Sequence, residues 1–439
     1  MKTFRGGIHP SHSKSSTEKK AIESAKDPDL VVISLQQHIG APCNPVVNVG
    51  DAVKVGQKIG DAEAFVSAPI HSSVSGIIKE IKDLTTPTGH SYCIVIESDG
   101  KNEMDEAVQP KPDISVLKKE EILTAIRDAG IVGMGGATFP AHVKLSPPPD
   151  KKIDTLIING AECEPFLTAD HRLMLERPDY VAYGMKLLMK ALSVEVAYLG
   201  IEENKPDAIK AMGELLKAEK GMEVMVLKAK YPQGAEKQLI SACTGRRVPS
   251  GKLPMEVGVV VSNVGTVAAI GEAFRTGMPL VKRIVTITGG GIAEPKNLEV
   301  RIGTLFKDVI EECGGYKGVP GKIIMGGPMM GLAQYTDEIP CTKGTSGILI
   351  LNEEEARIPE AKNCIRCGKC VGACPMGLMP LYLNAYYEKN MIGNAEEMNA
   401  LDCMECGSCS FVCPSKRHLV DSIRAAKNEI NAIKKKQQQ

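Results

Sequence analysis

The sequence carries no surplus of charge of either sign. Its 53 Lys and Arg residues balance its 53 Asp and Glu residues, so the formal net charge is zero. Proteins that bind nucleic acid through its phosphates need a basic field or a basic stripe. We therefore expect no nucleic-acid partner.

Long apolar stretches are also missing. No run approaches the roughly 18 residues that a membrane-spanning helix needs. The first 20 residues have no apolar core of the kind found in a secretory leader. With 43% apolar and 24% charged residues, the composition is that of an ordinary soluble protein. We expect a cytosolic polypeptide that could still dock on a membrane complex.

A disulfide framework is absent as well. Six of the 14 cysteines are scattered without a common spacing, unlike those of a small secreted domain. We expect them to be reduced thiols. They are Cys43, Cys93, Cys163, Cys243, Cys313 and Cys341.

The other eight cysteines form two copies of C-x2-C-x2-C-x3-C-P, beginning at Cys364 and Cys403. Thiolates on such tight loops suit an iron–sulfur cluster, and in this pattern the fourth cysteine crosses to the other cluster. Zinc is the alternative, because paired C-x2-C motifs also bind it, but three cysteines per loop and a Cys-Pro favour clusters. The predicted ligand sets are Cys364, Cys367, Cys370 and Cys413 for one cluster, and Cys403, Cys406, Cys409 and Cys374 for its neighbour.

The segments around these motifs have helical periodicity. Apolar residues recur three and four apart in residues 378–390, 395–401 and 419–433, which predicts helices. We expect a mostly helical two-cluster ferredoxin domain, with the terminal KKKQQQ frayed.

A glycine-rich loop lies upstream, after a predicted amphipathic helix over residues 115–129. Its glycines leave backbone N–H groups open to a phosphate, and Lys144 follows as a point charge. The spacing is G-x-G-G rather than the G-x-G-x-x-G of dinucleotide-binding folds, and a plain turn is the alternative. The glycines are Gly130, Gly133, Gly135 and Gly136.

Polar side chains follow the next predicted strands. Asn159, Glu162 and Glu164 come directly after an apolar strand over residues 153–158, and Asn263 follows another buried strand. Open α/β sheets bind their ligands at the carboxyl ends of such strands. The turn YPQGAE adds Tyr231, Gly234 and Glu236 to the candidate residues.

In this order the motifs GxGGAxFP with a following lysine, NxxExEP, YPxGxE and SNVxT resemble the flavin- and NADH-binding subunit of respiratory complex I. Together with the remaining parts, the chain is similar to the RnfC subunit of Rnf complexes, which couple ferredoxin and NAD to ion pumping. The resemblance extends from Phe4 to Cys413.

The resemblance implies a multidomain α/β and α+β protein. Residues 1–110 would form a barrel-sandwich domain similar to lipoyl carriers. The hairpin tip at residues 60–68 has no lysine to modify, so we expect a structural or docking module. Residues 111–278 would form a Rossmann-like FMN- and NAD(H)-binding domain, residues 279–352 a soluble-ligand-binding β-grasp domain, and residues 353–439 the helical domain with two [4Fe-4S] clusters.

The resemblance also implies residue roles. The FMN phosphate and ribityl chain would lie on Gly133, Gly135, Gly136 and Lys144. The isoalloxazine and nicotinamide pocket would be lined by Asn159, Glu162, Glu164, Tyr231, Gly234, Glu236 and Asn263. No catalytic side chain is expected, because the flavin itself exchanges the hydride.

This sequence departs from the complex I pattern at four positions. Met134 replaces an arginine, Ala161 an aspartate, Ala235 a glutamate and His142 a glycine. These departures bear most on the NADH contacts, because they remove two carboxylates and one guanidinium.

The function implied is that of the RnfC component of an Rnf complex, an ion-transporting ferredoxin:NAD+ oxidoreductase and translocase. It would exchange electrons between NAD(H), through FMN, and two [4Fe-4S] clusters. Its partners would be the membrane-embedded and iron–sulfur Rnf subunits, and through them ferredoxin, at the cytoplasmic face of the cell membrane. One alternative is a soluble RnfC-like donor to a cytosolic reductase. Another is a non-enzymatic electron wire or scaffold.

Overall fold

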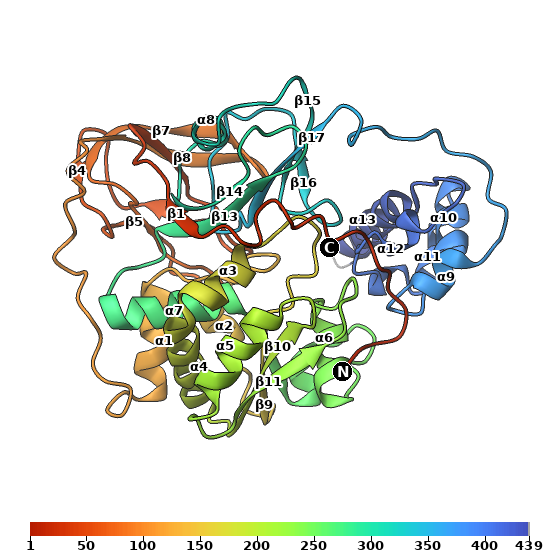
Figure 1. Ribbon diagram of the computed structural model, residues 1–439, viewed down its shortest axis with the longest axis horizontal. Helices are drawn as coiled ribbons and strands as arrows, with labels where there is room; N and C mark the ends of the chain where they lie inside the picture. Colours follow the sequence, from red (N-terminus) through yellow and green to blue (C-terminus); the bar gives the residue numbers. More distant parts are fainter. Residues whose placement is uncertain (438–439) are drawn as a thin grey trace.

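The computed structural model describes residues 1–437, and a parallel sheet forms the core of its middle part (Figure 1). The strands lie in the order β11-β10-β9-β12. Side chains of β9 alternate between faces, so Leu156 and Ile158 pack with α4 and α7 while Ile157 packs with α6. Burial on both faces accounts for the near-continuous apolar run. The bounds are β9 (Thr155–Asn159), β10 (Val196–Glu202), β11 (Met222–Leu227), β12 (Val259–Asn263), α4 (Pro178–Leu192), α6 (Glu236–Thr244) and α7 (Val264–Thr276).

Helices α4 and α7 pack in close contact on one face of this sheet. A Cβ added at Gly184 would lie 2.0 Å from the carbonyl oxygen of Val267, and one at Gly271 would lie 2.2 Å from that of Tyr180. Only glycine allows backbones to approach so closely. The shorter elements around this sheet are α1 (Lys119–Asp128), α2 (Ala141–Lys144), α3 (Ala169–Glu176), α5 (Pro206–Leu216) and η1 (Pro254–Val257).

The N-terminal barrel-sandwich domain has two small sheets around an apolar core. One sheet has the order β2-β8-β7-β4 and the other β3-β5-β6, and both contribute to the same cluster of buried side chains. The hairpin tip between β5 and β6 carries Phe65, which is 62% exposed. The bounds are β2 (Leu30–Ser34), β3 (Asn44–Pro45), β4 (Ala52–Val53), β5 (Lys58–Asp61), β6 (Ile70–His71), β7 (Gly76–Thr86) and β8 (Gly89–Ser98).

A mixed sheet forms the β-grasp domain, in the order β1-β14-β13-β17-β15-β16. The three consecutive glycines Gly289–Gly291 lie in the connection of an antiparallel hairpin, between β13 and β14. The helix α8 packs against this sheet, and its buried side chains belong to the same apolar core as those of the strands. The bounds are β1 (Ile22–Ser24), β13 (Lys282–Thr288), β14 (Lys296–Arg301), α8 (Phe306–Glu312), β15 (Pro320–Met325), β16 (Leu332–Gln334) and β17 (Gly347–Asn352).

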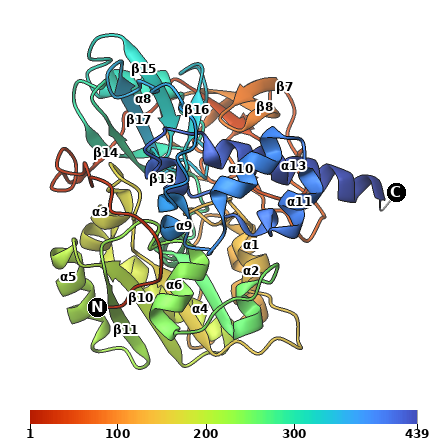
Figure 2. The same ribbon diagram turned by 90° about the vertical axis from the view of Figure 1, so that its right-hand side faces the viewer.

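The C-terminal domain is helical and lies beside the other domains, close to α6 and β16 (Figures 1 and 2). Its core joins α10, α11 and α13. Helix α13 continues through Lys434–Lys436, where we expected fraying, whereas Gln438 and Gln439 lie outside the described residues. The bounds are α9 (Lys369–Ala373), α10 (Pro380–Glu388), α11 (Ile392–Glu397), η2 (Ala400–Asp402), α12 (Ser408–Phe411) and α13 (Leu419–Gln437).

Among residues 1–437, no helix combines the length and the apolar character needed to span a bilayer.

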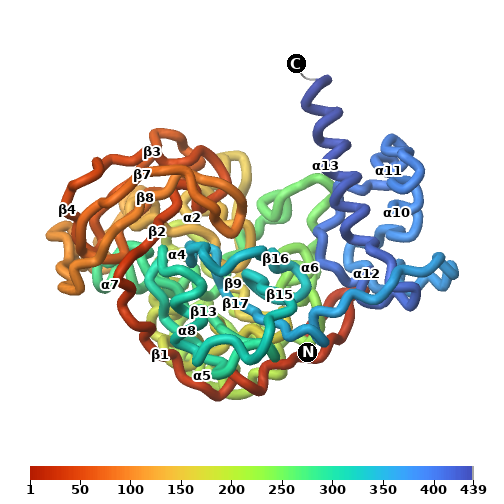
Figure 3. The backbone as a smooth tube through the Cα atoms, turned by 90° about the horizontal axis from the view of Figure 1, so that it is seen from above, coloured from red at the N-terminus to blue at the C-terminus, as the bar shows by residue number. Residues whose placement is uncertain are grey.

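The first 24 residues connect three of the domains. Figure 3 shows this segment running along one side of the molecule from the barrel sandwich to the helical domain. Strand β1 joins the β-grasp sheet, and the backbone of Ile8 forms an isolated antiparallel β-bridge with that of Tyr231. The amide of Gly7 donates to the carbonyl oxygen of Ala373, at 2.8 Å. The N-terminal segment therefore fastens the helical domain to the parallel-sheet domain.

Candidate functional site

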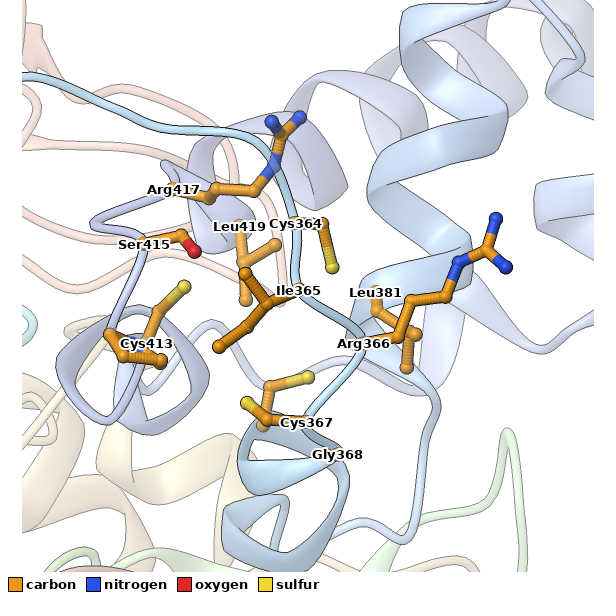
Figure 4. Close-up of a pocket in the computed structure, with 12 residues that line it drawn as sticks. Cys364, Ile365, Arg366, Cys367, Gly368, Leu381, Cys413, Ser415, Arg417 and Leu419 are labelled. Atoms are coloured by element: carbon orange, nitrogen blue, oxygen red, sulfur yellow. The ribbon is translucent and has the colours of Figure 1, made fainter.

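The eight motif cysteines gather around two pockets in the helical domain. Each pocket is lined by three cysteines of one repeat and the fourth cysteine of the other repeat. Figure 4 shows three of the sulfurs of the first pocket, those of Cys364, Cys367 and Cys413. We call the first pocket the outer cradle, lined by Cys364, Cys367, Cys370 and Cys413, and the second the inner cradle, lined by Cys374, Cys403, Cys406 and Cys409.

The two cradle loops have the same backbone conformation. Arg366 and Glu405 occupy equivalent positions and are both left-handed, with φ of 53° and 60°. Gly368 and Gly407 follow, also left-handed, and serve as the N-caps of the short helices α9 and α12. These turns bend each C-x2-C-x2-C segment back on itself, so that its thiols converge on one space.

The donor set of both cradles fits an iron–sulfur cluster. Backbone N–H groups already point at two of the thiols, since Leu378 donates to Sγ of Cys374 and Glu405 to Sγ of Cys403, both at 3.4 Å. Such bonds help to set cluster potentials. Within residues 1–437, no three His, Cys, Asp or Glu side chains lie close enough together to share a single metal ion. A four-iron cluster is larger than one ion and separates its cysteines further.

The inner cradle contacts the parallel-sheet domain directly. Tyr231 is 1% exposed, and its hydroxyl donates to the carbonyl oxygen of Cys406 at 2.8 Å. The Gln238 amide donates to the carbonyl oxygen of Pro375 at 3.2 Å. Tyr231 is one of the residues predicted to line the flavin pocket, and its hydroxyl binds the loop of the inner cradle.

The glycine loop lies against the start of α7. The amide of Gly133 donates to the carbonyl oxygen of Phe139 at 2.8 Å, and that of Met134 donates to Oγ1 of Thr266 at 2.9 Å. A Cβ added at Gly135 would lie 2.8 Å from the Asn263 side chain, whereas one at Gly136 would meet nothing within 4 Å. Gly135 is therefore packed, whereas its neighbour Gly136 is open.

Lys144 lies on α2, beside this loop. Its Nζ donates to Oε1 of Glu236 at 2.6 Å, and both side chains are 38% exposed. A half-exposed ion pair of this kind is worth little, on the order of 0–1 kcal/mol. A phosphate could therefore replace the Glu236 carboxylate as the partner of the Lys144 ammonium.

The amides of the site hold the strand ends together. Asn159 donates to the carbonyl oxygen of Gly234 at 2.8 Å. Asn263 is the N-cap of α7, accepting from the amides of Gly265 and Thr266, and its Nδ2 donates to Oδ2 of Asp170 at 2.7 Å. The predicted turn residues thus meet at the carboxyl edge of the sheet.

Glu162 is buried and points at the start of α3. Its carboxylate accepts from the amide of Asp170 at 2.6 Å and lies 3.6 Å from Nζ of Lys14. Burial raises the pKa of Glu162 to about 7, opposed by the charge of Lys14. Burial also lowers the pKa of Lys14. The N-terminal segment thus supplies the counter-charge of a predicted site residue.

Glu164 connects the site to the β-grasp domain. Its two carboxylate oxygens accept from the amides of Met329 and Met330, at 3.1 and 2.9 Å, in the turn between β15 and β16. Burial raises the pKa of Glu164 to about 7, above its ordinary value of 4.5. The carboxyl therefore keeps its proton in the folded chain at pH values where the unfolded chain has lost it.

This shift predicts that stability falls with rising pH. Between about pH 4.5 and 7 the unfolded chain binds fewer protons at Glu164, so the free energy of unfolding decreases as pH rises. Glu164→Gln should remove part of this decrease, on the order of 2 kcal/mol. Urea unfolding of the flavin-free chain at pH 5 and pH 7.5 measures it. Glu223→Gln, at an exposed position of β11, is the matched control. Parallel pH dependences for E164Q and the unsubstituted chain would contradict the prediction.

Several residues around the site gave no signal in the sequence. Lys14 sits in a polar N-terminal stretch, and Asp170 lies in α3, outside the quoted motif positions. Thr266 ends the SNVxT motif but was not among the candidate residues. Arg283 reaches the glycine loop from β13, and its Nη1 lies 2.9 Å from Sδ of Met134. Their contacts join segments far apart in the chain, which local patterns do not reveal.

Comparison with known families matches each part of the chain. Residues 2–101 match the RnfC barrel sandwich hybrid domain, and residues 126–272 the Nuo51 FMN-binding domain. Residues 284–333 match the SLBB domain, and residues 357–414 the 4Fe-4S dicluster domain. Fold and site thus define a multidomain flavin and iron–sulfur electron-transfer protein.

Whole-length relatives narrow this class. The chain is 51% identical over 99% of its length to the C subunit of the Na(+)-translocating ferredoxin:NAD(+) oxidoreductase complex of Acetobacterium woodii, covering 98% of that protein. It is 55% identical over 98% of its length to the C subunit of the proton-translocating ferredoxin:NAD(+) oxidoreductase complex of Clostridium ljungdahlii, covering 95% of it. Identity is 42% to the C subunit of the ion-translocating oxidoreductase complex of Rhodobacter capsulatus, over 98% of this chain and 83% of that one. The chain belongs to the RnfC family.

Proposed function

We propose that this chain is the NAD(H)-facing subunit of an Rnf complex, exchanging electrons between NAD(H), through FMN, and two [4Fe-4S] clusters. FMN, when bound, converts two-electron hydride chemistry into the one-electron steps that clusters accept. Oxidation of ferredoxin and movement of Na+ or H+ belong to partner subunits. The relatives named above, matched over nearly their whole length, support this assignment.

The observation that best supports electron transfer between the flavin site and the clusters is the hydrogen bond from Tyr231 to the carbonyl oxygen of Cys406. It joins the YPxGxE turn, which leads into α6 at Glu236, to the loop of the inner cradle. Ile8, Cys163 and Met329 pack around the same contact. A buried, close-packed connection of this kind keeps two redox groups at a fixed separation.

The positions of the two cradles indicate their order. The inner cradle touches the parallel-sheet domain, whereas Cys364 and Cys367 of the outer cradle are exposed. Ile365, between them, is 68% exposed. We assign the inner cluster to exchange with the flavin and the outer cluster to exchange with a partner subunit.

For the chain's own residues we propose the following roles. Gly133, Gly135, Gly136 and Lys144 receive the phosphate and ribityl chain of FMN, since the loop leaves Gly136 open and Lys144 is held by an exchangeable pair. Asn159, Gly234, Glu236 and Asn263 shape the pocket floor at the carboxyl edge of the sheet. Glu162 and Glu164 act from behind it, because their carboxylates bind backbone amides.

Lys144→Ala tests the phosphate assignment. We expect FMN affinity to fall by roughly tenfold or more, since a charge-assisted contact to phosphate is lost. Iron content should be unchanged, because Lys144 contacts neither cradle. Lys151→Ala is a matched control, being a nearby lysine whose Nζ pairs with Glu256 at 3.0 Å. Flavin and iron are counted in the purified, reconstituted chains. Unchanged flavin content in K144A would refute the assignment.

We further propose that the chain works peripherally at the cytoplasmic face of the cell membrane, with the membrane-embedded and iron–sulfur subunits of the complex as partners. Co-sedimentation with membranes that contain those subunits, and its loss from membranes that lack them, is the expected result. Recovery of all of the chain in the soluble fraction would favour a soluble electron donor instead.

A further inference from the structure

Arg283 is a buried cation whose guanidinium reaches out of its own domain. It belongs to β13 of the β-grasp sheet and is 7% exposed. Its Nη1 donates to Sδ of Met134 in the glycine loop, at 2.9 Å. Its Nε is buried without any hydrogen-bond partner.

This arrangement leaves the charge of Arg283 incompletely balanced. A guanidinium has five N–H donors, and a thioether sulfur is a weak acceptor. In the described part of the chain no carboxylate forms an ion pair with Arg283, although the charge of Asp170 acts on it. Oδ2 of Asp170 accepts from the neutral amide of Asn263. Oδ1 of Asp170 would lie 3.3 Å from a Cβ added at Gly265, which Nη1 of Arg283 also approaches. A buried cation with no carboxylate at ion-pair distance is costly, which points to a further anionic group that completes the site.

The position of Arg283 indicates which anion this is. Its Nη1 would lie 3.6 Å from a Cβ added at Gly265, in the first turn of α7. The glycine loop packs on that same turn, since Met134 donates to Thr266. The positive end of a helix and a guanidinium both attract phosphate. Arg283 thus stands behind the loop where the proposed FMN phosphate would bind.

The identity of the loop residue strengthens this interpretation. Met134 occupies the position at which the complex I pattern has an arginine. A guanidinium contributed by another domain, that of Arg283, contacts the methionine at this position.

We propose that Arg283 is a positioning residue that supplies, from the β-grasp domain, the positive charge of the flavin-phosphate site. This inference rests on the proposed FMN site. Arg283 acts on the phosphate across Met134 and the glycine loop, by electrostatic attraction in a poorly solvated region. Burial lowers its pKa to about 10, so the charge is retained at neutral pH.

Titration of the flavin-free chain with FMN and with riboflavin, followed by quenching of flavin fluorescence, tests this role without any turnover. Riboflavin has the same ring and ribityl chain but no phosphate. Arg283→Met should weaken FMN binding by roughly tenfold or more, because one nearby charge is removed, and change riboflavin binding by less than about twofold. Arg283→Lys should retain most of the FMN affinity. The double variant Met134→Arg with Arg283→Met should regain it by returning the guanidinium to the loop.

The outcomes separate the two proposals. If R283M weakened the binding of FMN and of riboflavin equally, or changed the binding of neither, either result would show that Arg283 has no role in recognising the phosphate. If the double variant bound FMN as weakly as R283M, an arginine at position 134 could not replace Arg283, and this result would also overturn the proposal. If the unsubstituted chain bound neither flavin, the proposed flavin site itself would fail.

Discussion

Replacing Cys413 by alanine should remove about half of the iron, and this loss should not add to that caused by Cys364→Ala. Both residues line the outer cradle although they come from different repeats, so either substitution disables the same cluster. A chain with two four-iron clusters holds about eight iron atoms. C413A, C364A and the double variant should each retain about four.

A double substitution that affects both cradles should remove twice as much iron. Cys403 lines the inner cradle, so Cys403→Ala combined with Cys413→Ala should remove nearly all of the iron. Cys313→Ala, at a buried cysteine outside both cradles, controls for the loss of a thiol. Iron and sulfide are counted after anaerobic reconstitution. If C403A with C413A kept about four irons while C364A with C413A kept none, each cluster would belong to its own repeat.

Gly135→Ala should weaken FMN binding and also destabilise the chain. The new methyl group would lie 2.8 Å from the side chain of Asn263. Asn263 cannot swing aside, because it caps α7 and binds Asp170. Overpacking of this kind costs about 1–3 kcal/mol, and the loop must shift to relieve it.

Gly136→Ala is the matched substitution one residue on, where an added Cβ meets nothing within 4 Å. The free energy of unfolding of the flavin-free chain should change little. FMN affinity should still fall, by roughly tenfold, because the methyl group enters the space assigned to the ribityl phosphate. Urea unfolding and fluorescence titration measure the two effects separately. Undiminished FMN affinity in G136A would place the flavin elsewhere.

The elements that local sequence predicts well are those with a strong local signal. The two C-x2-C-x2-C-x3-C-P motifs form similar turns. Each pocket is lined by three cysteines of one repeat and the fourth of the other. The apolar run before Asn159 forms β9, and the polar residues after it gather at the carboxyl edge of the sheet. The order of the motifs along the chain sufficed to recognise the four kinds of domain, and the family matches confirm these kinds.

What the sequence could not reveal is the contact between segments that are distant along the chain. Nothing in a polar N-terminal stretch predicts that Lys14 is buried against Glu162, or that β1 completes a sheet formed near residue 300. The YPxGxE motif alone does not show that the hydroxyl of Tyr231 binds the cluster loop. The sequence did not indicate a role for Arg283 for the same reason, since its partner Met134 lies in another domain.

The central claim is that one chain connects NAD(H) to two iron–sulfur clusters through FMN. The most direct measurement is an anaerobic titration of the reconstituted chain, loaded with FMN and about eight irons, with NADH. Absorbance of the flavin and of the clusters is followed in the same sample. We expect the flavin absorbance to bleach and the cluster absorbance to fall with it. A chain that holds FMN and both clusters but shows no change with NADH would contradict the proposed function.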